Sequence, residues 1–151
     1  MHIGIYGANN LNFVEFNLTG DMETIQRCDR DSLYLNTEVF NLFSECFENS
    51  NNLYDYFGPN KYNSRNIVVL LNELNTNLYH LVGIKSYTEF SDFVTSKFLG
   101  TTFLNELEGE NVDWADDWNI YKLMLIEINE RLLSLVNDCI ERERILWLIG
   151  Y

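Results

Sequence analysis

The sequence predicts one helix-rich α+β domain with four or five helices around a long central C-terminal helix and a small sheet. Its 151 residues are a usual length for one domain, and no repeat or linker divides residues 1–151. Hydrophobic residues make up 46% of the chain, which is enough for one core. Apolar residues recur with a period of two near the N-terminus and at helical spacing from about residue 37.

The first third of the chain and its apolar tail predict the sheet. Residues 3–6 and 14–18 have the pattern of short strands, and the second range alternates apolar and polar side chains. Residues 7–10 between them predict a turn, so the two strands would form an N-terminal hairpin. Residues 33–35 are a third candidate strand. The tail over residues 145–149 fits either a continued helix or a strand beside the hairpin, and we favour the strand.

Helical spacing begins at residue 37. Residues 37–49 place five apolar side chains on one stripe, namely Val39, Phe40, Phe43, Cys46 and Phe47. An Asn-rich loop is expected over residues 50–64. Ser64 is the predicted N-cap of a second helix, which Gly83 would end.

Two further helices are predicted after Gly83. Ser86 and Glu89 fit a capping box that opens the third helix, and Gly100 is expected to end it. The longest helix should begin at residue 116 or 117 and run to about residue 144. Its apolar residues extend beyond a single face, which indicates a central helix with more than one neighbour.

Motifs for catalysis, cofactors or metals are missing from the sequence. The chain has two histidines and three widely spaced cysteines, with no C-x-x-C pair, nucleophile elbow, phosphate loop or calcium loop. We therefore predict a non-enzymatic protein without a cofactor or metal. The cysteine pattern and the short apolar runs predict a cytoplasmic location and no membrane partner. The sequence does not indicate which oligomeric state the protein adopts.

The charge is the most unusual property of the sequence. There are 23 acidic and 10 basic side chains, a net charge of −13. The abundance of Asn, Ile, Tyr and Phe, with only two Ala and one Pro, is typical of an AT-rich genome. That bias also favours Lys, yet Lys occurs only at positions 61, 85, 97 and 122. We interpret the acidity as a property maintained by selection.

One segment, residues 106–118, interleaves acids with tryptophans and contains no base. Its last three aspartates are expected to cap the long helix and to complement its dipole. The three glutamates are expected in a short connection, where their mutual repulsion has no structural explanation. Tryptophan is often an interface anchor. The predicted partner-binding residues are Glu106, Glu108, Glu110, Asp113, Trp114, Asp116 and Asp117.

These observations favour an acidic binding protein that neutralises a basic protein partner. A nuclease-type toxin has the required basic cleft, and toxin immunity proteins offer an analogy of size and charge. The alternative is a nucleic-acid mimic whose carboxylates imitate phosphates and inhibit a DNA-binding enzyme. A second alternative is an enzyme that uses carboxylate chemistry. Direct nucleic-acid binding is disfavoured because the chain would repel phosphates.

Overall fold

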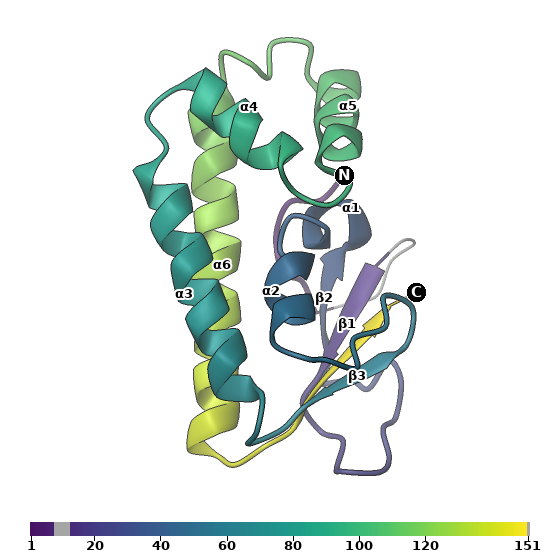
Figure 1. Ribbon diagram of the computed structural model, residues 1–151. Helices are drawn as coiled ribbons and strands as arrows, with labels where there is room; N and C mark the ends of the chain where they lie inside the picture. The colour runs from purple at the N-terminus through teal and green to yellow at the C-terminus, as the bar shows by residue number, and fades with distance from the viewer. Residues whose placement is uncertain (8–12, 151) are drawn as a thin grey trace.

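The computed structural model describes residues 1–7 and 13–150, which form a helix-rich α+β fold (Figure 1). This confirms the predicted fold class, including the long C-terminal helix. In chain order the elements are β1 (Phe13–Asn17), β2 (Leu33–Asn36), α1 (Thr37–Phe40), α2 (Ser44–Asn49), β3 (Pro59–Tyr62), α3 (Ile67–Gly83), α4 (Tyr87–Thr95), α5 (Gly100–Glu110), α6 (Trp118–Glu141) and β4 (Leu146–Gly150).

The elements form layers. α3 and α6 lie side by side as a long pair, α1 and α2 lie between this pair and the sheet, and α4 and α5 cover one end (Figure 1). One face of α6 is buried, with Leu125, Leu132 and Val136 in the core. Its opposite face carries Leu123, which is 55% exposed. Some of the apolar side chains of α6 therefore face solvent and not the core.

A buried amide pair joins the two long helices. Asn77 on α3 donates from Nδ2 to Oδ1 of Asn129 on α6 at 2.8 Å, and Asn129 Nδ2 donates to the Leu74 carbonyl oxygen at 2.9 Å. Both asparagines are buried, at 4% and 0% exposure. Buried amides need such partners, so the pair fixes how α3 and α6 align.

The sheet is antiparallel throughout, with the strand order β2-β1-β4-β3. The tail is a strand, as favoured, and it pairs with both β1 and β3. The predicted N-terminal hairpin is wrong, because β1 pairs with β2 and β4. From residues 3–6, Tyr6 makes an isolated bridge to Tyr34. Most of the expected turn at 7–10 lies outside the described residues.

Both faces of β1 are buried, for different reasons. Phe16 packs towards α1 and α2, with its ring 6.3 Å from that of Phe40. On the other face Glu15 and Asn17 are fully buried under the segment 18–32. Glu15 accepts hydrogen bonds from Ser32 Oγ at 2.6 Å and from the Cys28 backbone N–H. A loop that hydrogen-bonds to these polar side chains therefore covers this face. An amphipathic helix could not cover it in the same way, because it would need an apolar surface to pack against.

Two segments differ from their predicted structure. The predicted helix over residues 37–49 is two short helices, α1 and α2, and in the turn between them Ser44 Oγ donates to the Asn41 carbonyl oxygen at 3.0 Å. Strand β3 emerges from the expected loop over residues 50–64. Pro59 fits there because β3 is an edge strand, where a missing N–H is tolerated.

The helix boundaries are partly as predicted. Ser86 Oγ accepts the Glu89 backbone N–H at 3.2 Å, which confirms the N-terminal half of the capping box. Ser64 is not an N-cap, because α3 begins three residues later and Asn66 precedes it. Gly100 opens α5 and does not end α4.

Candidate functional site

The three glutamates of the acidic segment lie on a helix and not in a connection. Glu106, Glu108 and Glu110 belong to α5, whose Phe103 and Leu107 face the core. At about 100° per residue, Glu106 and Glu108 lie about 160° apart around the helix axis. All three side chains are exposed, but they flank the solvent face of α5 and do not form one cluster.

The aspartates lie around the turn between α5 and α6. Asn111 organises this turn: its Oδ1 accepts the Asp113 backbone N–H at 3.0 Å, and its Nδ2 donates to Asp117 Oδ2 at 3.0 Å. Asp117 directly precedes α6, but its carboxylate makes no cap hydrogen bond. The predicted capping role is therefore wrong for Asp117. Asp113 and Asp116 are exposed.

Trp114 is a core residue. Its side chain is 7% exposed and its ring centre lies 5.4 Å from that of Tyr87 at the start of α4. The predicted role of Trp114 in partner binding stays a prediction, and its burial leaves little ring surface for a partner to contact. Trp114 instead ties the α5–α6 turn to α4, so the segment offers charge to a partner without this aromatic side chain.

The basic side chains are largely engaged within the molecule. Arg142 pairs with Asp138 at 2.8 Å and Lys97 with Glu45 at 3.3 Å. Other bases donate to backbone carbonyl oxygens: Lys61 to Met22, Lys122 to Ile84, and Arg131 to Ile5. Bonds to carbonyls leave carboxylates without a neutralising partner.

Most of the acidic side chains, by contrast, face solvent. Of the 23 acids, only Glu15 is buried, and all 23 lie within the described residues. Near the acidic segment the Met1 amino group pairs with Glu110. No base occurs in the sequence between Lys97 and Lys122. Among the described residues, Glu110 is the one acid of this segment with an ion-pair partner, so the other carboxylates are left for a partner or for counterions.

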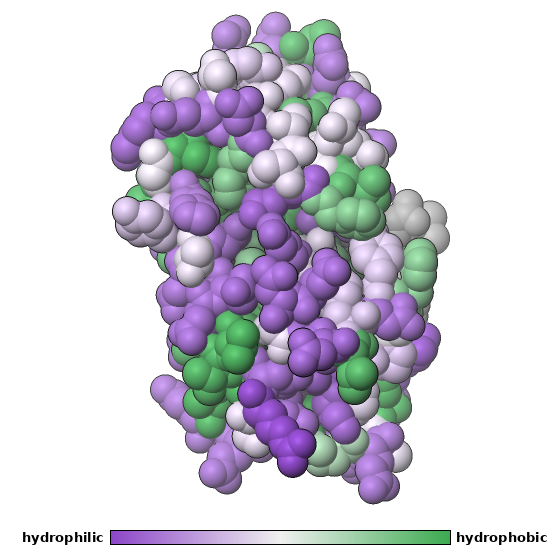
Figure 2. All heavy atoms as spheres, in the orientation of Figure 1, coloured by the Kyte–Doolittle hydropathy of each residue, from purple (hydrophilic) through white to green (hydrophobic). Residues whose placement is uncertain are grey.

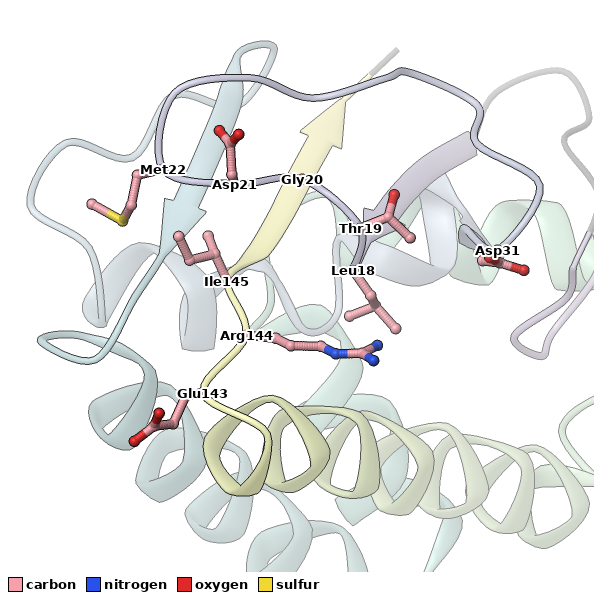
Figure 3. A pocket seen from close by; sticks show the side chains of 9 residues that line it. All are labelled: Leu18, Thr19, Gly20, Asp21, Met22, Asp31, Glu143, Arg144 and Ile145. Carbon is pink, nitrogen blue, oxygen red and sulfur yellow. The ribbon is translucent and has the colours of Figure 1, made fainter.

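A groove of about 570 Å³ lies between the segment after β1 and the α6–β4 connection (Figure 3). Arg144 extends along it below Leu18, and Asp21 lies on the far side. The backbone N–H groups of Glu23 and Thr24 donate to Asp21 and lower the pKa of its carboxyl. General-acid catalysis needs a raised carboxyl pKa, so this groove gives the carboxylate-enzyme hypothesis no support.

Within residues 1–7 and 13–150, no group of three His, Cys, Asp or Glu side chains could hold a metal ion. No helix in the same residues is long and apolar enough to span a bilayer. Comparisons with protein-family models, with curated protein sequences and with solved structures found no match.

Proposed function

We propose that this protein is a non-enzymatic acidic binding protein that captures a basic protein partner. The partner class that fits best is a protein with a basic nucleic-acid-binding cleft, such as a nuclease-type toxin. The observation that carries the proposal is the α5–α6 end, where exposed carboxylates face solvent and no base lies between Lys97 and Lys122. A cytoplasmic location accompanies it, supported by three free cysteines.

The physical basis is electrostatic steering. A surface with a net charge of −13 attracts a basic cleft over distances of about one Debye length, roughly 8 Å at physiological salt. Such steering raises association rates by about 10- to 1000-fold. Lys122 and Arg131 support this reading locally, because their hydrogen bonds go to backbone carbonyl oxygens and not to carboxylates.

The test is the salt dependence of association. Inactivated nuclease-type toxin domains would be immobilised, and the association rate of the protein measured by surface plasmon resonance at low and high salt. We expect a fall of at least about tenfold as salt is raised. Association that does not change with salt would contradict the proposal.

A matched pair of variants tests the location. Neutralising Glu106, Glu108 and Asp116 as E106Q/E108Q/D116N should slow association by about tenfold. The control E127Q/E130Q/E141Q removes the same charge from exposed positions on α6. Equal slowing by both variants would show that net charge acts without this site.

Competition with DNA separates the main alternative. A nucleic-acid mimic would displace duplex DNA from DNA-binding proteins of unrelated fold, because it presents phosphate-like charge. A dedicated binding protein should displace DNA only from its own partner. Broad displacement would replace our proposal with mimicry.

A further inference from the structure

Three aromatic rings meet at the surface from two distant parts of the chain. Tyr56 lies between Phe57 and Phe98, with ring centres 4.9 and 5.4 Å away and both contacts edge-on. Phe57 is 74% exposed and Phe98 is 52% exposed. Together with the adjacent Leu99, also exposed, these residues form what we call the aromatic patch. Figure 2 shows hydrophobic surface over the α4–α5 connection, bordered by hydrophilic surface.

The backbone under the patch is strained and tightly fixed. Leu99 has φ 51°, which is a left-handed backbone conformation. This conformation is energetically unfavourable for any residue that has a side chain. The next residue must be glycine, because a Cβ on Gly100 would lie 1.7 Å from the Val94 carbonyl oxygen. The corner between α4 and α5 thus holds Phe98 and Leu99 on the surface. Strain of this kind marks positions where a function is worth testing.

The patch has an acidic surround. Burial, and then the nearby carboxylate of Glu38, raise the pKa of Tyr56, whose hydroxyl donates to Asn41 Oδ1 at 2.7 Å. Asp55 is exposed on the same loop as Tyr56. The nearest base in sequence, Lys97, is paired with Glu45 and its side chain is only 14% exposed. A partner therefore meets aromatic rings beside carboxylates.

We infer that the aromatic patch is the docking centre for the basic partner. That partner would place on the patch an arginine or lysine and, beside it, an apolar side chain of its own. This inference rests on the proposed function and adds a contact surface to it. Exposed aromatic rings are typical hot spots, and arginine stacks on such rings while pairing with carboxylates. A second copy of this chain fits less well, because a two-fold contact through the patch would bring two surfaces that both carry Glu38 and Asp55 together, like charge facing like charge.

A displayed random-peptide library tests the inference without a known partner. Peptides would be selected on the wild-type protein and measured against F57S/F98S, whose substitutions are at exposed side chains. We expect the enriched peptides to carry net positive charge and an aromatic or large apolar residue. Their affinity should fall by about 10- to 30-fold on F57S/F98S. The control L53S/V112S alters two apolar residues that are 88% and 84% exposed outside the patch, and it should change affinity less than twofold.

The other outcomes separate the two proposals. Basic peptides whose affinity is unchanged by F57S/F98S but reduced by E106Q/E108Q/D116N would overturn the inference about the patch. The proposed function would remain standing. Selection of only neutral or acidic peptides, or of none, would overturn the patch, and the salt test would still decide the proposed function. A wild-type dimer that F57S/F98S converts to a monomer in sedimentation would assign the patch to a second copy. Circular dichroism and thermal melting would verify that all variants are folded.

Discussion

The buried amide pair between α3 and α6 gives the sharpest test of what aligns the long helices. Replacing Asn129 with leucine removes its hydrogen bonds of 2.8 and 2.9 Å and leaves the Asn77 amide buried without that partner. Replacing Asn77 with leucine likewise leaves Asn129 Oδ1 buried without its hydrogen-bond donor. Replacing both removes the unpaired groups and adds apolar surface to the interface.

The magnitudes follow from the cost of buried polar groups. An unsatisfied buried donor or acceptor costs about 1–3 kcal/mol, and each lost hydrogen bond costs about 1 kcal/mol more. Burying a leucine side chain returns about 1.5 kcal/mol. We therefore expect N129L and N77L each to lower the free energy of unfolding by about 2 kcal/mol. The double variant should be close to wild type, so the two single losses of about 2 kcal/mol each correspond to a coupling energy of about 4 kcal/mol.

Urea unfolding followed by circular dichroism and tryptophan fluorescence measures these differences. The matched control is N75L, the same substitution at an exposed position of α3, which should change stability by less than about 0.5 kcal/mol. If the double variant loses the sum of the two single losses, the amides are not coupled and the reasoning is wrong.

Three further predictions concern the fold. Gly100→Ala places a Cβ 1.7 Å from the Val94 carbonyl oxygen and should cost about 3 kcal/mol or more in urea unfolding, whereas a near-neutral result would contradict the tight corner. Ser86→Ala removes the cap of α4 and should cost about 1 kcal/mol, and no change would show that the cap is dispensable. Burial raises the pKa of Cys46 to about 12 and of Cys139 to about 11, so both thiols favour the folded state below pH 9. That stability should be lost between about pH 9 and 12, and replacing both cysteines with alanine should weaken this pH dependence of the free energy of unfolding.

Much of the fold could be predicted because burial follows simple periods. The helical spacing of α6 and the N-cap at Ser86 are local patterns, and the structure bears them out. Strand β3 could not be found this way, because its sequence Pro-Asn-Lys-Tyr has no strand alternation and its pairing partner lies far along the chain. The buried Glu15 was equally hidden, since its hydrogen-bond partners come from a loop of irregular sequence.

The sequence predicted which acidic residues the candidate site contains, but not how those residues are arranged in space. Sequence spacing located the exposed acids, yet it placed Glu106 and Glu108 in a connection because Gly100 and Gly109 weaken the helical pattern of α5. The burial of Trp114 depends on contact with Tyr87, which no local pattern shows. The aromatic patch joins residues about 40 positions apart, so only the folded chain brings them together.

The position of β4 has a consequence for synthesis on the ribosome. This strand lies between β1 and β3, although roughly 130 residues of chain separate it from β1. While the nascent chain is shorter than about 150 residues, β1 and β3 each lack their common neighbour and present open edges. The sheet must therefore close after the long helices have left the exit tunnel. Truncation before residue 146 should expose those edges to chaperones and to aggregation.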